Sequence, residues 1–221
     1  MKTATLKRLW KNEYVKTAVM IILIITIVFG FWYGIQLVLN TPYPALAVAS
    51  GSMCTLPGPY CDGWSHPFEH TLHVGDLIIV QGVNPKYIKT GPYPYGDIIV
   101  FRKPGSTDEL IVHRAIDNAT GPDGKIYFRT QGDGNPGPDS FTGEGSWHFM
   151  VSQDLVIGKV IMRIPWVGHL ALFMHNSSGI FLIAIIIIIL LVLEIIIPIF
   201  TGKEKETETE QVEGVEKAFE A

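Results

Sequence analysis

An uncharged apolar stretch near the N-terminus limits what this chain can fold into more than any other feature of its sequence. Residues 17–39 contain no charged side chain, whereas residues 1–16 carry five lysines or arginines and one glutamate. As a helix with a rise of about 1.5 Å per residue, the stretch would extend roughly 35 Å, enough to cross the hydrocarbon core of a bilayer. Because basic flanks stay in the cytoplasm, we expect a cytoplasmic N-terminus over 1–16 and a transmembrane helix over 17–39.

A cleavable signal peptide is the alternative interpretation of this stretch. Ala45, Ala47 and Ala49 provide the alternating small residues that follow the apolar core of such a peptide. That core is only about 7–15 residues long, however, and the stretch here is much longer. The sequence therefore favours a permanent anchor.

A second apolar run near the C-terminus predicts a second transmembrane helix over residues 179–200. It contains Glu194 near its end and is followed by Lys203 and Lys205, which again predicts a cytoplasmic side. Residues 201–221 are rich in glutamate, and we expect an acidic cytoplasmic tail. With both ends inside, residues 40–178 would form an extracytoplasmic domain on a two-pass protein of the plasma membrane.

The expected extracytoplasmic region has the pattern of a mainly β domain. Short runs of Val, Ile and aromatic residues are separated by Gly, Pro, Asn or Asp, as is typical of antiparallel strands. The runs are 76–81, 97–102, 110–116, 125–130 and 155–164. They predict an antiparallel β-sandwich or a partly open barrel, flanked by the two membrane helices. The net charge is only −4, and Lys and Arg are scattered, so we expect no nucleic acid as a partner.

Several side chains of this region could take part in nucleophilic catalysis. Ser50-Gly51-Ser52-Met53 comes shortly after the first apolar stretch, and a short Ser-Gly-Ser turn can direct a hydroxyl and backbone N–H groups into one space. A serine needs a base to remove its proton and a third group to orient that base. His113 lies late in an apolar run, and Asp133 and Asp139 lie in a Gly- and Pro-rich loop. Taken separately, the histidine could equally be a core residue, and the carboxylates could stabilise a turn.

Taken together and in order, several motifs resemble the type I signal peptidase family, in the branch found in archaea and the endoplasmic reticulum. The motifs are Ser50–Met53, Gly75–Ile78, Gly96–Phe101, Ile111–Arg114, Gly132-Asp133 with Asn135 and Asp139, Gly158–Val160 and Pro165–Gly168. The resemblance extends from about Ala45 to Leu170. In this branch a histidine before an arginine takes the place of the lysine base of the bacterial enzymes, and His113 occupies that place.

The resemblance implies roles for individual residues. Ser52 would be the nucleophile, His113 the general base and Asp139 the carboxylate that orients the imidazole. We group Asp133 with these catalytic residues, and because it lies between Gly132 and Gly134 we expect it to hold the loop by bonding backbone N–H groups. Ser50 and Met53 would contribute to the oxyanion hole and the substrate-binding surface.

The resemblance also implies a function. It predicts a membrane-bound serine endopeptidase that removes signal peptides from secreted preproteins, cutting after small residues at positions −1 and −3. Its partners would be these preproteins, the lipid bilayer and the secretion translocon, and no metal or organic cofactor would be needed.

The segment from Cys54 to His73 leaves alternatives open. Cys54 and Cys61 could form a disulfide, remain free thiols, or bind zinc together with His66, His70 and His73. Lys103 offers a Ser/Lys pair as an alternative to His113, although a lysine before proline more often begins an exposed turn. A third alternative is a membrane-anchored β module that binds translocating chains without cleaving them.

Overall fold

The structure is a computed structural model that describes residues 13–55, 61, 70–177, 179–190 and 192–193. The chain divides into two compact units, Met1–His169 and Leu170–Ala221. The sheet and the candidate site both belong to the first unit.

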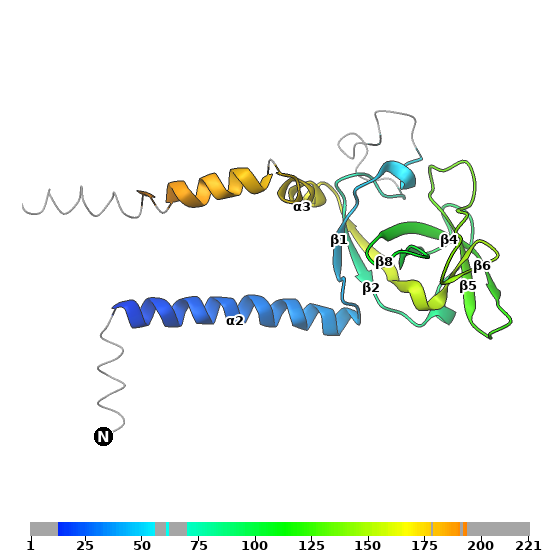
Figure 1. Cartoon of the computed structure of the whole chain (residues 1–221), viewed down its shortest axis with the longest axis horizontal. Coiled ribbons are helices and arrows are strands. Elements are labelled where there is room, and N and C mark those ends of the chain that lie inside the picture. The colour runs from blue at the N-terminus through cyan, green and yellow to red at the C-terminus, as the bar shows by residue number, and fades with distance from the viewer. Residues whose placement is uncertain (1–12, 56–60, 62–69, 178, 191, 194–221) are drawn as a thin grey trace, which may run out of the picture. The chain divides into compact units, whose positions relative to one another are not determined.

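The apolar stretch near the N-terminus forms one continuous helix, α2 (Glu13–Leu39), drawn in blue in Figure 1. Within the described residues, its segment Val15–Leu39 is the one unbroken helix that is long and apolar enough to cross a membrane. Its large side chains face outward; Ile22 is 63% exposed and Leu37 is 82% exposed. A helix with an apolar surface around its whole circumference needs an apolar surrounding, which a bilayer provides.

The structure does not show the second expected membrane helix as one span over residues 179–200. Gly179–Leu190 is helical and follows α3 (Val167–His175) after a sharp bend, and the bent pair together is apolar enough for one span. Residues 194–200 of the expected helix, and the expected tail over 201–221, lie outside the described residues. A continuous helix over 179–200 and the two-pass topology therefore stay predictions.

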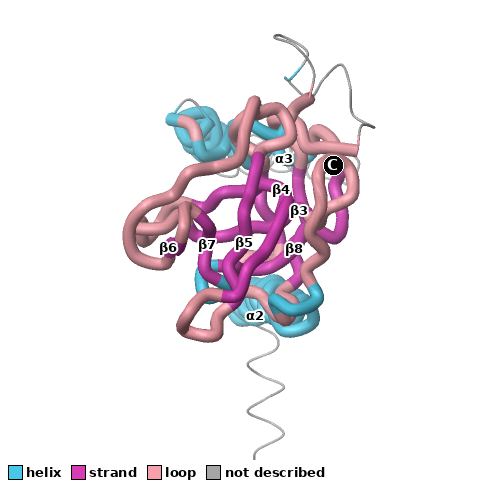
Figure 2. The backbone as a smooth tube through the Cα atoms, turned by 90° about the vertical axis from the view of Figure 1, so that its right-hand side faces the viewer, coloured by secondary structure: helices cyan, strands magenta, loops and turns pink. Residues whose placement is uncertain are grey.

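Eight strands form a single antiparallel sheet, which confirms the expectation of a mainly β domain. Its strand order is β1-β2-β8-β3-β4-β5-β7-β6, and Figure 2 shows β8, β3, β4 and β5 side by side in its centre. The strands are β1 (Ala45–Ala47), β2 (Leu77–Gln81), β3 (Ile98–Arg102), β4 (Leu110–Thr120), β5 (Ile126–Gln131), β6 (Ser146–Trp147), β7 (Met150–Ser152) and β8 (Val156–Ile164). Three 3₁₀ helices accompany them among the described residues: η1 (Gly51–Met53), η3 (Pro85–Tyr87) and η4 (Gln153–Leu155).

Of the two expected β architectures, the sandwich is wrong, because the strands pair into one curled sheet rather than two stacked ones. The open half-barrel corresponds to the partly open barrel. Three irregularities in strand register help to explain the curl. The β2–β8 pairing shifts between Ile79 and Val80, the β3–β8 pairing between Val100 and Phe101, and the β4–β5 pairing between Ala115 and Asp117. A bulge bends its strand and increases the local twist. Gly158 of β8 permits a close approach here, since a Cβ would lie 2.3 Å from the Gln81 carbonyl oxygen.

The curled sheet buries two apolar clusters, one on each side of β3. Val100 belongs to the first cluster, with Val48, Met53, Leu72, Ile78 and Val80. Ile99 and Phe101 belong to the second, with Ile88, Ala115, Phe128 and Val151. Because successive side chains of a strand point to opposite faces, these two clusters explain why the sequence of β3 is apolar at every position from Ile98 to Phe101.

A tight turn before β2 fixes the segment that leads to Ser52. Gly75 has a φ of +86°, a conformation that glycine adopts without strain. Its N–H donates to the Val48 carbonyl at 2.9 Å, and the Val48 N–H donates to the Asp76 carbonyl at 2.9 Å. The Asp76 carboxylate is fully buried and accepts the His73 N–H at 2.8 Å. The Gly75-Asp76 pair therefore ties the chain after β1 to the start of β2.

We expect Asp76→Asn to gain stability relative to the wild type as the pH rises. Burial raises the pKa of the Asp76 carboxyl above its ordinary value of 3.8, so the folded protein binds this proton more tightly than the unfolded chain does. The contribution of Asp76 to stability is therefore fully present below pH 3.8 and is lost as the pH rises through the folded-state pKa. Asparagine does not titrate. Urea unfolding of both proteins at about pH 4 and about pH 7 measures the change; an equal stability difference at both values would contradict it.

Candidate active site

Ser52 lies in the middle of η1, a single 3₁₀ turn that follows β1. The Cys54 N–H closes the turn by donating to the Gly51 carbonyl at 2.9 Å. Ser50 precedes the turn in extended conformation, and its hydroxyl lies 3.3 Å from the Ser52 hydroxyl. Met53 is only 1% exposed and packs into the first apolar cluster. Met53 also lies among the residues that line the groove beside Ser52, so its contribution to substrate binding stays a prediction, and its side chain in addition anchors the turn to the core.

His113 of β4 reaches Ser52 across 61 positions of sequence. Its Nε2 lies 3.0 Å from the Ser52 Oγ, which is within hydrogen-bonding distance. The residue is 8% exposed. The central position of β4 in the sheet, with β3 on one side and β5 on the other, gives the imidazole a rigid support.

Asp139 lies on the far side of the imidazole. Its Oδ2 is 2.6 Å from the His113 Nδ1, so a carboxylate there favours the tautomer with hydrogen on Nδ1 and leaves the Nε2 lone pair facing Ser52. Thr130 holds the carboxylate in place: its hydroxyl donates to the same Oδ2 at 2.7 Å, and its carbonyl accepts the Asp139 N–H at 2.8 Å. No sequence motif points to Thr130, since a lone threonine inside a strand is common.

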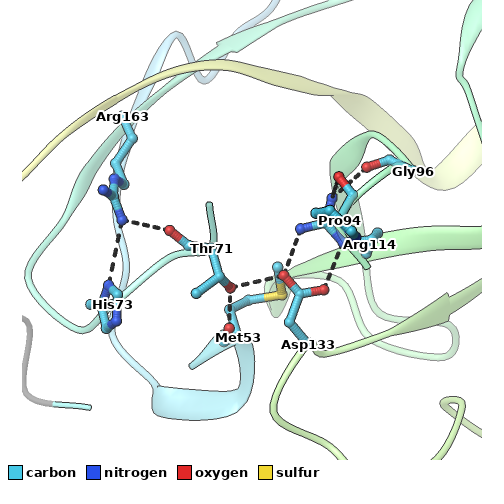
Figure 3. Close-up of polar contacts among 8 residues, drawn as sticks. All are labelled: Met53, Thr71, His73, Pro94, Gly96, Arg114, Asp133 and Arg163. Atoms are coloured by element: carbon cyan, nitrogen blue, oxygen red, sulfur yellow. Dashed lines mark hydrogen bonds and ion pairs between the residues drawn. The ribbon is translucent and has the colours of Figure 1, made fainter. Parts of the chain in front are cut away.

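Asp133 occupies a different place from Asp139. Its Oδ1 and Oδ2 accept from the Arg114 Nε at 2.7 Å and Nη2 at 2.6 Å. The two side chains are 2% and 3% exposed. Thr71 provides a third contact, with its hydroxyl 2.8 Å from Oδ2 (Figure 3). This corrects the expectation that Asp133 bonds backbone N–H groups of its own loop. Its partner is instead a guanidinium from a distant strand, which donates two charge-assisted hydrogen bonds and which turn rules based on neighbouring residues cannot predict.

Arg114 follows His113 directly in β4 and points to the opposite face of the strand, as alternation requires. Its Nη1 donates to the Gly96 carbonyl at 2.5 Å and to the Pro94 carbonyl at 3.3 Å. The guanidinium therefore connects the strand carrying His113 to the loop before β3 as well as to the loop after β5.

Two glycines allow the loop after β5 to press against the turn that carries Ser52. A Cβ at Gly132 would lie 2.4 Å from the Ser52 carbonyl oxygen, and one at Gly134 would lie 2.0 Å from the Cys54 carbonyl oxygen. The Gly134 N–H donates to the Ser52 carbonyl at 3.0 Å. Any larger residue at Gly134 would push the loop away from the turn.

A groove of about 380 Å³ opens beside Ser52 and His113. One side is formed by the chain from β1 into η1, and the other by β4. Most of its lining is apolar or small: Leu46, Ala47, Val48, Ala49, Ser50, Ser52, Met53, Glu109, Leu110, Ile111, Val112 and His113. Its volume and its two strand walls fit a short extended peptide.

The structure also bears on the two alternative sites, a zinc site at the cysteines and a Ser/Lys pair with Lys103. Cys54 and Cys61 are joined by a disulfide with a Cα–Cα distance of 5.6 Å, so neither sulfur is a thiolate for zinc. His66 lies outside the described residues. Lys103 forms an ion pair with Glu109 at 2.8 Å, while the side chain that contacts the Ser52 hydroxyl from β4 is the His113 imidazole.

A hydroxyl, an imidazole and a carboxylate in this sequence of contacts can perform acyl transfer. The imidazole can take the serine proton, and the carboxylate can stabilise the resulting imidazolium. The three groups come from η1, β4 and the loop after β5, and only the folded chain brings them together.

Comparison with known proteins identifies relatives that are catalytic subunits of the signal peptidase complex. A signal peptidase complex catalytic subunit of Tuber melanosporum is 28% identical over 156 residues, covering 69% of this chain and 74% of that protein. The subunit of Neurospora crassa is 29% identical over 153 residues, covering 69% and 76%. One from Homo sapiens is 26% identical over 171 residues, covering 77% and 78%. No protein-family model matches the chain.

We expect Asp133→Asn to destabilise the protein more than Asp139→Asn. Removing one charge of the buried Arg114–Asp133 pair leaves the other uncompensated, which costs about 3–5 kcal/mol. Asp139 is 11% exposed in its side chain and faces an imidazole that can remain neutral, so its amide variant leaves no buried charge. Urea unfolding of both variants measures the two losses. Equal losses, or a larger one for Asp139→Asn, would contradict the assignment of Asp133 to a structural ion pair.

Proposed function

Because the chain is homologous to catalytic subunits of the signal peptidase complex, we propose that it is a membrane-bound serine endopeptidase that removes signal peptides from preproteins. The observation that carries the proposal is the line of contacts from Ser52 through His113 to Asp139, at 3.0 and 2.6 Å. It supplies the nucleophile, the base and the orienting group in the order that peptide hydrolysis by serine requires.

In the first half of the reaction, Ser52 would attack the carbonyl carbon of the scissile peptide bond. The Ser52 proton passes to the His113 Nε2 as the Oγ–C bond forms. Asp139 holds the Nδ1–H and stabilises the imidazolium. When the tetrahedral intermediate collapses, the C–N bond breaks, and His113 gives its proton to the leaving amine. The products of this step are an acyl-enzyme and the free N-terminus of the mature protein.

In the second half, water would take the place of the leaving amine. His113 removes a proton from the water molecule as the water oxygen attacks the acyl carbon. Collapse of the second intermediate breaks the bond to the Ser52 Oγ, which recovers its proton from His113. The signal peptide leaves with a new carboxylate.

The negative oxygen of both intermediates needs donors close to Ser52. The Ser52 N–H is one candidate, and the Ser50 hydroxyl is the other, because it lies 3.3 Å from the nucleophilic oxygen. Such donors act on charge that appears only in the transition state, so they raise turnover more than binding.

The groove supports a preference for small residues at −1 and −3. In an extended peptide, residues two apart point the same way, so both side chains would face one wall of the groove. The β1 wall of the groove presents the small residues Ala47 and Ala49, and the opposite wall is formed by β4. The groove of about 380 Å³ between these walls must hold several peptide residues at once.

The proposal also covers the surroundings of the enzyme. We assign residues 1–16 to the cytoplasm, 17–39 to a membrane helix, 40–178 to the extracytoplasmic peptidase domain, 179–200 to a second membrane helix and 201–221 to a cytoplasmic tail. The apolar surface of α2 supports the first span. Substrates would emerge from the same bilayer, and a membrane complex like that named for the relatives, together with the secretion translocon, would be its partners.

The decisive experiment is cleavage of a preprotein in detergent by wild type and Ser52→Ala. We expect no cleavage by Ser52→Ala and unchanged thermal unfolding. Ser50→Ala should cleave about 10²–10³-fold more slowly, as when a single oxyanion donor is lost. Ser146→Ala is the matched control, since the Ser146 hydroxyl donates to the Gly143 carbonyl in a distant hairpin. Cleavage at the wild-type rate by Ser52→Ala would exclude the serine mechanism. A wild type that binds preproteins without cleaving them would favour a non-catalytic module.

The orienting role of Asp139 makes a separate kinetic prediction. Asp139→Asn should lower kcat by about 10⁴-fold, because an amide can favour the wrong tautomer and cannot stabilise the imidazolium. Its KM for the preprotein should change little, since Asp139 is not among the groove-lining residues. Steady-state kinetics measures both constants. Wild-type kcat in Asp139→Asn would refute the role.

A further inference from the structure

A buried threonine, Thr71, contacts the turn that carries Ser52 and has no role in the proposed reaction. Thr71 is 1% exposed. Its hydroxyl lies against the Met53 carbonyl and is 2.8 Å from the Asp133 Oδ2, as Figure 3 shows. Both partners are acceptors, so the single hydroxyl proton bridges them by being shared in a three-centre hydrogen bond. Thr71 therefore sits between the residue after the nucleophile and the buried carboxylate.

The backbone of Thr71 is itself fixed by Arg163 of β8. The Arg163 Nη1 donates to the Thr71 carbonyl at 2.6 Å and lies 3.5 Å from the buried Asp76 Oδ2. A charged donor makes a stronger hydrogen bond than a neutral one. Thr71 is thus attached to the sheet on one side and to the serine turn on the other.

The serine turn depends on such outside contacts. η1 has three residues and one closing hydrogen bond, from the Cys54 N–H to the Gly51 carbonyl. Its other carbonyls are held from outside: Gly134 donates to the Ser52 carbonyl at 3.0 Å, and Thr71 contacts the Met53 carbonyl. These two contacts limit rotation of the peptide planes on either side of Met53, and with them the direction of the Ser52 hydroxyl.

The same threonine connects the nucleophile to the strand that carries the base. From Thr71 the contacts continue through Asp133 to Arg114, and Arg114 is the neighbour of His113 in β4. This path links η1 to β4 independently of the direct contact between Ser52 and His113.

We propose that Thr71 is a positioning residue for Ser52, which holds the nucleophile at the correct distance and direction from His113 by bridging the Met53 carbonyl and Asp133. The inference rests on the proposed peptidase function. Its expected signature is kinetic, because a misplacement of about 1 Å between reacting groups can cost about 10²-fold in rate. Substrate binding in the groove should be spared, since Thr71 is not among the residues that line it.

The test compares three variants of the full chain in detergent, with a preprotein as substrate. Thr71→Val keeps the shape and removes the hydroxyl, while Thr71→Ser keeps the hydroxyl. Thr41→Val is the matched control. Thr41 is also buried, at 4% exposed, and its hydroxyl accepts the Tyr43 N–H at 3.2 Å rather than contacting the turn that carries Ser52. We expect Thr71→Val to lower kcat about 10–10²-fold with KM nearly unchanged. Thr71→Ser should stay within about threefold of wild type, and Thr41→Val should keep wild-type kcat.

Several results would overturn the inference. Wild-type kcat in Thr71→Val excludes a positioning role. An equal loss in Thr41→Val, or in Thr71→Ser, indicates general destabilisation rather than loss of the bridge. If Thr71→Val does not fold, Thr71→Cys replaces it, because a thiol is a weak donor of similar size to a hydroxyl.

A second measurement separates this inference from the proposed function. If the wild type does not cleave preproteins, the peptidase proposal fails, and the bridge is then tested by NMR of protein labelled at the methionine methyl groups, with Met53 assigned through Met53→Leu. The bridge predicts that Thr71→Val shifts the Met53 resonance, whereas Thr71→Ser and Thr41→Val leave it in place. A Met53 resonance that is the same in Thr71→Val and wild type would refute the bridge itself.

Discussion

The buried ion pair between Arg114 and Asp133 is the interaction on which the candidate site depends. Its side chains are 3% and 2% exposed, so each charge relies on the other, and neither can leave without a large cost. Arg114 belongs to the strand that carries His113, and Asp133 belongs to the loop that carries Asp139. The pair therefore fixes His113 and Asp139 relative to each other, although it lies on the opposite face of β4.

The pair also explains why two aspartates in one loop have different surroundings. Asp133 faces a permanent cation, whereas Asp139 faces an imidazole and the Thr130 hydroxyl. A carboxylate opposite an arginine is a structural element, while a carboxylate opposite a histidine can respond to a proton arriving on the ring. Glycine on either side of Asp133 lets the loop approach the serine turn closely enough for both arrangements to exist together.

The sequence was sufficient for the elements with strong local signals. The charge-free stretch over 17–39 predicted a long apolar helix, and runs of β-branched residues predicted β2, β3, β4, β5 and β8. It missed β1, β6 and β7, which have two or three residues each, because alternation cannot be recognised over so short a length. The sandwich expectation failed for a related reason: period-two patterns show that a face is buried, and the same pattern arises when one sheet curls over itself.

For the candidate site, the residue types and their order can be read directly from the sequence: a serine turn, a histidine before an arginine, and two aspartates six positions apart. The folded chain is needed to learn that the Ser52 Oγ and the His113 Nε2 lie 3.0 Å apart, and that Asp139 rather than Asp133 contacts the Nδ1. Thr130 and Thr71 entered the site in the same way, without any motif. The physical reason is that hydrogen bonds between residues far apart in sequence depend on strand register and loop contact, which local patterns of polarity do not encode.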